Sequence, residues 1–188
     1  GMRKTHLLSM ISLTIPVVVY EILKHKHQLV RILVFLHPEQ NQLGDGYQIS
    51  QSLIAIGSGG LWGRGLGQGL QKYGFLPDGH TDFIFSIMCE EIGFIGATVV
   101  LLLFAFLIWQ GIRVAVRSSD LFATLLAAGV TAMIACQVSI NTGMALSLLP
   151  TKGMPLPFIS YGGSSLVFTL LAMGILMNVA QYVSEPYK

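Results

Sequence analysis

Charged residues are scarce in this sequence. Aspartate, glutamate, lysine and arginine together make up 11% of its 188 residues, whereas hydrophobic residues make up 53%. Soluble globular domains usually contain about 25% charged residues. The balance excludes an ordinary soluble domain and indicates a protein whose helices lie in a lipid bilayer.

The sequence also lacks a large excess of charge of either sign. Its net charge is +2, and its basic residues stand in short clusters. Proteins that bind nucleic acid through its phosphates concentrate their cations along one face or one long run. We therefore expect no nucleic-acid partner.

Cysteine is nearly absent. Cys89 and Cys136 lie far apart, each in an apolar stretch, so neither the spacing of a zinc site nor that of a redox pair is present. We expect both to be buried packing residues. His25 and His27 lie in a basic patch that has no cysteine or carboxylate at ligand spacing. No metal site is predicted.

Long apolar runs without charge are what the sequence has in abundance. Three of them are long enough to cross a hydrocarbon core, which takes about 20 helical residues: residues 92–112, 121–149 and 155–184. A fourth run, residues 7–23, contains Pro16 and Glu21, so it fits either a span or an interfacial helix, and we expect a span. The sequence thus predicts an all-α integral membrane protein with about four transmembrane helices.

A long segment, residues 24–81, separates the first run from the others within a single membrane domain, residues 1–188. Apolar and polar residues alternate over residues 47–56 in a way that predicts a short amphipathic helix at the membrane surface. The glycines of residues 57–69 should end this helix. Long loops in compact proteins are usually functional when they are not disordered, so we look for the chemistry there.

The glycine-rich stretch, residues 58–69, matches neither the dinucleotide fingerprint nor the P-loop pattern. Its glycines permit close approach of backbone N–H groups to a ligand, and Arg64 and Lys72 stand near enough in sequence to pair with phosphate. A flexible turn over the membrane surface explains the same composition. Both interpretations stay open from the residues alone.

Asp82 follows a turn marked by Pro77 and Gly79 and precedes an apolar helix. A carboxylate at such a position is often a helix cap or a partner of the helix dipole. Its aromatic neighbours would also lower the local dielectric and raise its proton affinity towards the range of a general base. Glu90, two turns further along the helix, is better placed than Glu91 to contribute to the same site.

A second irregular segment, residues 149–165, contains three prolines beside the bilayer. Irregular backbone at membrane depth is tolerated where it lines a cavity or is covered by protein. Lys152 is the only charge between residues 121 and 184, so we expect it to pair with a carboxylate or an anionic substrate. The polar residues of the preceding run are expected to serve helix packing; they are Gln137, Ser139, Asn141 and Thr142.

Two stretches resemble the SEDS family of peptidoglycan polymerases (shape, elongation, division and sporulation): His-Thr-Asp-Phe-Ile-Phe at residues 80–85 with Glu90-Glu91, and Pro-Leu-Pro-Phe-Ile-Ser-Tyr-Gly-Gly-Ser-Ser at residues 155–165. Pro-Thr-Lys-Gly at residues 150–153 is similar to the division and sporulation branch, FtsW and SpoVE. Members have about ten transmembrane helices, and this sequence resembles the seventh to the tenth. The resemblance implies cytoplasmic ends and an extracytoplasmic loop over residues 24–81.

The resemblance also implies an activity. The intact protein would polymerise lipid II into β-1,4 glycan strands and release undecaprenyl pyrophosphate, for septal or spore wall synthesis at the bacterial plasma membrane. Two other functions fit the residues: a flippase for a lipid-linked precursor, or a non-catalytic assembly module for a class B penicillin-binding protein. Expected partners are lipid II, the nascent glycan strand, that penicillin-binding protein and other divisome proteins. No cofactor is expected, and a requirement for a divalent cation stays open.

The resemblance assigns the catalytic base to Asp82. The residues expected to bind substrate are Lys152, Ser160, Gly162, Gly163, Arg64, Lys72, His80 and Glu90. The cations among them would offset the charge that develops on the departing pyrophosphate.

Overall fold

The computed structural model describes residues 4–24, 45–74, 76–77 and 79–184, and every regular element in these ranges is a helix. Its chain forms two units, residues 1–47 and residues 48–188. The basic patch with His25 and His27 lies outside the described residues. Helix α1 (Lys4–Lys24) of the first unit contains Pro16 and covers the predicted run of residues 7–23. That this helix spans a membrane stays a prediction.

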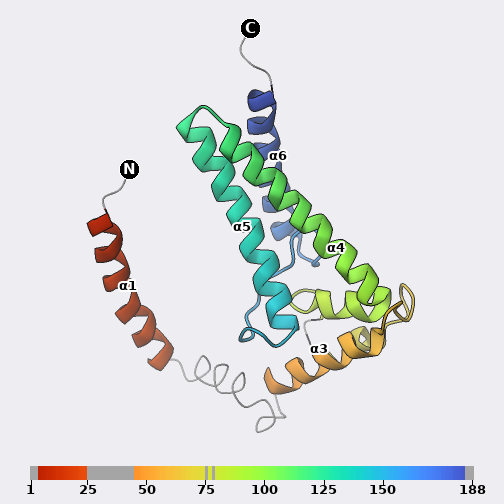
Figure 1. The fold of residues 1–188 in the computed structure, drawn as a ribbon. Helices are drawn as coiled ribbons and strands as arrows, with labels where there is room; N and C mark the ends of the chain where they lie inside the picture. Colours follow the sequence, from red (N-terminus) through yellow and green to blue (C-terminus); the bar gives the residue numbers. More distant parts are fainter. Residues whose placement is uncertain (1–3, 25–44, 75, 78, 185–188) are drawn as a thin grey trace. The chain divides into compact units, whose positions relative to one another are not determined.

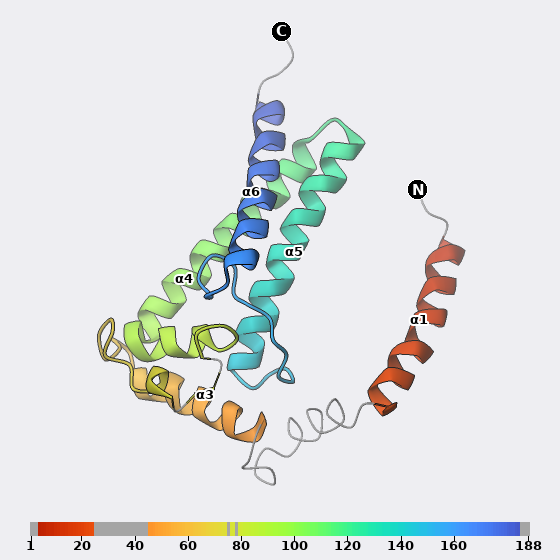
Figure 2. The same cartoon turned by 180° about the vertical axis from the view of Figure 1, so that it is seen from behind.

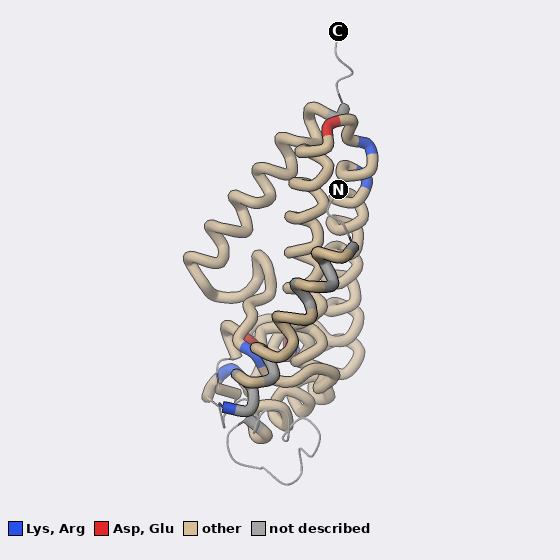
Figure 3. Tube along the Cα trace, turned by 90° about the vertical axis from the view of Figure 1, so that its left-hand side faces the viewer, with Lys and Arg blue, Asp and Glu red and all other residues tan. Residues whose placement is uncertain are grey.

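Three long helices build the second unit: α4 (Ile84–Arg117), α5 (Leu121–Ala145) and α6 (Gly163–Ser184). Each contacts the other two, and the two views of the ribbon show α6 lying along both (Figures 1 and 2). Among the described residues, these three are the helices long and apolar enough to cross a membrane. The charged residues of the three helices gather at their ends (Figure 3), as expected when the middle lies in hydrocarbon.

Small residues bring the helices close together. A side chain at Gly111 of α4 would collide with the Oγ1 atom of Thr131 on α5, so the two backbones approach there as small residues permit in membrane proteins. Cys89 is buried, as predicted. The prediction for Cys136 is wrong, because this residue is exposed on α5. An apolar side chain on a membrane helix can face lipid as readily as the core, and the sequence does not distinguish the two.

Helix α5 ends at Ala145, four residues before the end of the predicted run. The N–H of Leu148 donates to the carbonyl of Gly143, and the N–H of Ser147 donates to Met144. These two bonds form a Schellman motif, in which Ser147, with φ of 57°, takes the left-handed position that glycine usually occupies. The sequence stays apolar past Ala145, but the helix ends there.

Helix α6 begins at Gly163, whereas the apolar run predicted a start at residue 155. Pro155 and Pro157 cannot donate backbone hydrogen bonds, so a helix is disfavoured across them. The chain instead makes a turn in which Ile159 and Ser160 donate their N–H groups to the carbonyl of Leu156. Phe158 has a φ of 65° in this turn, a strained conformation for a residue other than glycine.

Helix α3 (Asp45–Gly59) confirms the predicted amphipathic helix and extends it by a few residues at each end. Ile49, Ser52, Ala55 and Gly59 form its buried stripe. The Ser52 hydroxyl lies 2.6 Å from the Ser86 hydroxyl of α4 and donates to the carbonyl of Ala145 at 2.7 Å. The stripe therefore fixes α3 against the start of α4 and the end of α5.

Candidate functional site

Helix α4 is broken at Gly93, which has φ of 72° and ψ of −176°. Figure 1 shows the bend between a short segment beside α3 and a long segment along α5. The N–H groups of Phe94 and Ile95, at the start of the long segment, donate to the carbonyls of Gly60 and Leu61. Free backbone groups at the break are thereby satisfied by the chain itself.

The residues that fill the break belong to the glycine loop, which we define as residues 60–71. Its N–H groups surround two carboxylates of α4. Glu90 accepts from Leu70 at 3.0 Å and from Gln71 at 3.2 Å, and Glu91 accepts from Gly67 at 3.0 Å. Close approach of backbone donors to an anion was one of the two interpretations of this sequence, and here the anions are the chain's own side chains.

Arg64 and Lys72 form ion pairs with these carboxylates. Arg64 Nη1 lies 3.5 Å from Glu90 Oε1, and Lys72 Nζ lies 2.8 Å from Glu91 Oε1. The hydrogen bond that the Lys72 ammonium donates to Glu91 raises the pKa of Lys72 above its ordinary value. The 3₁₀-helix η2 (Gln71–Tyr73) holds Lys72 in this position.

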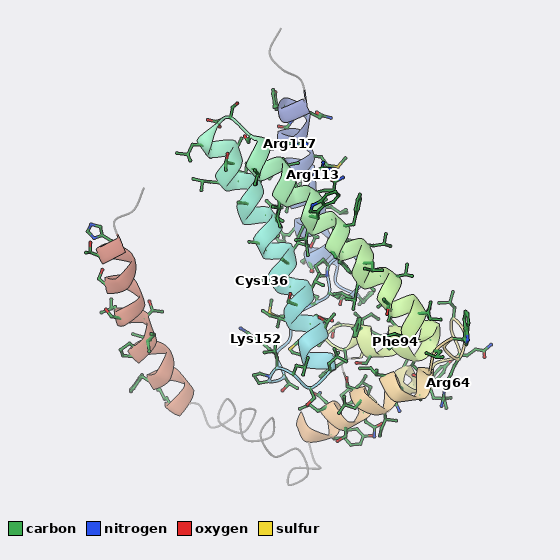
Figure 4. The ribbon with its side chains drawn as sticks, in the orientation of Figure 1. Arg64, Phe94, Arg113, Arg117, Cys136 and Lys152 are labelled. Atoms are coloured by element: carbon green, nitrogen blue, oxygen red, sulfur yellow. The ribbon has the colours of Figure 1, made fainter. Side chains whose placement is uncertain are left out.

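This cluster contains three of the residues expected to bind substrate: Arg64, Lys72 and Glu90. Glu90 is buried, with 1% of its surface exposed, and its contacts lie in the glycine loop. Figure 4 shows Arg64 and Lys152 on opposite sides of the lower part of the helices. In this structure the cations of Arg64 and Lys72 pair with the chain's own carboxylates, and a role for them in binding substrate stays a prediction.

The glycine loop gives a prediction about stability. Gly63 has φ of 79°, and a side chain there would collide with the carbonyl of Glu91 and lie 2.6 Å from the nitrogen of Gly93. Gly63→Ala should destabilise the full-length protein by at least about 2 kcal/mol, because left-handed strain and a backbone clash add. Thermal unfolding in detergent measures the effect.

Gly57→Ala is the matched control. Gly57 lies in α3, and nothing lies within 4 Å of an added side chain. Alanine in a helix is favoured over glycine by roughly 0.5 to 1 kcal/mol, so this variant should melt at or above the wild-type temperature. Equal melting temperatures for Gly63→Ala and wild type would show that the loop does not hold the break in α4.

The second cluster lies at the motif that contains Asp82. Three successive backbone carbonyls are each bound from a distant part of the chain. Tyr161 N–H donates to His80 at 3.0 Å, the Ser160 hydroxyl donates to Thr81 at 2.6 Å, and the Asn141 amide donates to Asp82 at 2.8 Å. We call these carbonyls and their three partners the Asp82 junction. The junction joins the two motifs that the sequence singled out.

The side chain of Asp82 is partly buried and lies against the loop that carries Lys152. A side chain built on Gly153 would meet Asp82 Oδ2 at 3.0 Å. The N-cap of α4 is Phe83, not Asp82, which disfavours the interpretation of Asp82 as that cap. Phe83 and Phe85, which follow Asp82 in the sequence, are buried, with 3% and 4% of their surfaces exposed.

Lys152 is held by its backbone while its side chain is exposed. Its N–H donates to the sulfur of Met144 at 2.9 Å, which ties the loop to the last turn of α5. The side chain extends beside the lower end of α5 (Figure 4). Asp82 thus lies against Gly153, the residue that follows Lys152.

Ser160, Gly162 and Gly163 lie at the other end of the same loop, and His80 contacts that end from the segment before α4. Ser160 accepts from the N–H of Leu156 at 2.7 Å while it donates to Thr81, so its hydroxyl shapes the loop. Gly162 accepts from Leu166, and Gly163 begins α6. His80 is exposed and contributes its carbonyl to the junction.

Sequence reasoning missed Asn141, which it assigned to helix packing. The signal was an amide in an apolar helix, but the partner of a buried amide cannot be deduced without the fold. Within the described residues, no group of three or more histidine, cysteine or acidic side chains comes together as in a metal site.

Comparison with known sequences places these motifs in context. The profile of the FtsW/RodA/SpoVE family, described as cell cycle proteins, matches residues 1–185. Stage V sporulation protein E of Bacillus subtilis is 51% identical over 161 residues, which cover 86% of this chain and 44% of that protein. A probable peptidoglycan glycosyltransferase FtsW of Geobacter metallireducens is 46% identical over 180 residues, covering 96% and 48%. The chain spans about half the length of these curated relatives.

Solved structures give the same picture. A chain from a structure titled as the coordination of polymerization and crosslinking by a peptidoglycan synthase complex matches with a TM-score of 0.68 at 29% identity, covering 95% of this chain and 48% of that one. An aspartate-to-alanine variant of the rod shape determining protein RodA from Thermus thermophilus matches with a TM-score of 0.55 at 35% identity, covering 72% and 41%.

Proposed function

The chain belongs to the FtsW/RodA/SpoVE family of cell cycle proteins, and from this premise we propose that it is the part of a multi-pass membrane glycosyltransferase that carries the reacting carboxylate. The full-length protein would polymerise lipid II into β-1,4 glycan strands for septal or spore wall synthesis. The observation that carries the proposal is the contact between Asp82 and the loop of Lys152 at Gly153. This contact supports the proposal because Gly153 follows Lys152 directly in the chain.

In the proposed reaction, the acceptor hydroxyl attacks the anomeric carbon of the donor sugar with inversion. The bond from that carbon to the pyrophosphate oxygen breaks, and undecaprenyl pyrophosphate leaves with the electron pair. Asp82 takes the proton of the hydroxyl as the new glycosidic bond forms. Lys152 lies one residue from the Asp82 contact, where a fixed cation would stabilise the charge that grows on the pyrophosphate.

The first turn of α6 would add donors for the same anion. Helix N-termini present backbone N–H groups that have no partner within the helix. Helix α6 begins at Gly163 and has no acidic residue in its first turn. We assign Gly162 and Gly163 to this role, and Ser160 and His80 to the shape of the loop around it.

A flippase is the second candidate, and the break in α4 is the observation that favours it, because transporters bind substrate at interrupted helices. The break leaves backbone groups of α4 without partners inside the helix. These groups, however, are bonded to the glycine loop, at Gly60, Leu61, Arg64 and Gly65. A break occupied by its own chain offers less to a substrate than an open one. We therefore prefer the polymerase.

The proposed partner is a class B penicillin-binding protein. The structure that this chain resembles is titled for a complex that coordinates polymerization with crosslinking, and a transpeptidase would supply the crosslinking. An assembly role does not exclude catalysis. Purification of the full-length protein with and without the transpeptidase distinguishes a partner that activates turnover from a module that only docks.

The deciding experiment compares polymerisation with transport. Full-length protein in detergent, supplied with purified lipid II, should yield glycan strands that lysozyme-type muramidases digest. Detergent micelles have no second leaflet, so lipid transport by a flippase gives no product in this assay. If the same preparation makes no glycan with or without its transpeptidase partner, but moves labelled lipid II across vesicle bilayers, the transport function replaces this proposal.

A further inference from the structure

Asn141 is buried completely near the carboxyl end of α5, with 0% of its surface exposed. Its Nδ2 atom donates two hydrogen bonds, one to the carbonyl of Asp82 at 2.8 Å and one to the carbonyl of Met154 at 2.7 Å. One nitrogen thus joins the segment that carries the proposed base to the segment that follows Lys152. These segments are separated by 59 and 13 residues from Asn141 in the sequence.

The chemistry of the bridge requires an amide at this position. A primary amide nitrogen carries two N–H groups, a hydroxyl carries one donor, and a carboxylate carries none. Within the described part of the chain, Asn141 Oδ1 has no hydrogen-bond partner. Burial of an unsatisfied polar atom costs roughly 1 to 3 kcal/mol, so the amide is held here for its donors and at some expense to stability.

The bridge fixes more than a single carbonyl. The two carbonyls before Asp82 are bonded to Ser160 and Tyr161, so the backbone is already restrained on one side of the carboxylate. Asn141 restrains it at Asp82 itself and, through Met154, restrains the residue after Gly153. Asn141 is therefore the side chain on α5 that restrains Asp82 and the residue after Gly153 together.

We propose that Asn141 is a positioning residue, which sets the distance between the Asp82 carboxylate and the loop of Lys152. It does not touch the reacting atoms. This inference rests on the proposed function of Asp82 as base. Small errors in the placement of reacting groups lower the rate of the chemical step more than the binding of substrate.

The test uses the full-length protein with two substitutions. Asn141→Ala removes both donors, and Asn141→Asp keeps the size of the side chain but replaces the donors by oxygen. Both should lower kcat for lipid II polymerisation by about tenfold, with KM for lipid II changed by less than about twofold. Thr142→Val is the matched control, because the Thr142 hydroxyl bonds within α5 to Val138 and Ser139. It should keep wild-type kcat.

Several outcomes would overturn the inference. A wild-type kcat in both Asn141 variants does so, as does a fall in kcat that Thr142→Val reproduces. Loss of folded protein in both variants does so as well, because the amide would then serve the fold and not the rate. Asp82→Asn, measured in parallel, separates the two proposals: if that variant polymerises normally, the assignment of the base fails first, whereas an inactive Asp82→Asn beside fully active Asn141 variants removes only the role of Asn141.

Discussion

Asp82→Asn in the full-length protein should lower lipid II polymerisation by roughly 10²- to 10⁴-fold, the range over which a general base contributes to catalysis. The amide has nearly the shape of the carboxylate but cannot accept the proton of the acceptor hydroxyl. The backbone of Asp82 is held by Asn141 through its carbonyl, which the substitution leaves in place. Membrane insertion and thermal stability should therefore remain close to wild type, so that the loss lies in the chemistry.

Asp120→Asn is the control for the same chemical change. The Asp120 carboxylate caps α5 by accepting from the N–H of Ala123 at 2.9 Å. Asparagine is about as good an N-cap as aspartate, so this variant should polymerise at the wild-type rate. Glycan yield measured over time for both variants gives the comparison. Normal polymerisation by Asp82→Asn would remove Asp82 from the role of base.

Lys152→Met should lower kcat by roughly 10²- to 10³-fold, the loss seen when one group that stabilises transition-state charge is removed. Methionine keeps much of the length of the side chain but not its charge. Lys152 is exposed and next to Gly153, which contacts the Asp82 carboxylate. Lys152→Arg should recover part of the loss, because the cation returns with a different shape. Single-turnover polymerisation at saturating lipid II isolates this step.

Arg117→Met controls for loss of a positive charge as such. Arg117 lies in the last turn of α4, at the end of the helices opposite to Lys152 (Figure 4). Its removal should leave kcat unchanged. A similar fall in both variants would mean that net charge, and not a cation at residue 152, limits turnover. Lys152 would then lose its place beside the leaving group.

Much of the helical framework could be predicted from apolar runs. The three predicted spans are present as α4, α5 and α6, and the amphipathic helix is α3. The ends of the helices could not be predicted from the ends of these runs. Ser147 ends α5 through a left-handed turn, and two prolines delay α6, while the residues around them stay apolar. Hydropathy reports the solvent that a residue prefers, not whether its backbone is helical.

The motifs that form the site could be predicted from the sequence, but the contacts between them could not. The sequence singled out the segments of Asp82 and Lys152, and the fold brings them into contact at Gly153. It also suggested that glycine-loop donors receive an anion. Whether that anion is a ligand or Glu90 depends on which turn of α4 packs against the loop, and this is a property of tertiary structure. The two donors of Asn141 could not be assigned for the same reason.

The interlocked bend in α4 has a mechanical consequence. Four backbone hydrogen bonds join the glycine loop to both sides of the bend. The N–H groups of Arg64 and Gly65 donate to the end of the short segment, and the N–H groups of Phe94 and Ile95, in the long segment, donate to the glycine loop. These bonds fix the angle between the two segments. A tilt of the long segment, with which a helix accommodates bilayer thickness, must then swing the short segment and Asp82 at its start. We therefore expect a change in bilayer thickness that alters the tilt of the long segment to change the orientation of the Asp82 carboxylate as well.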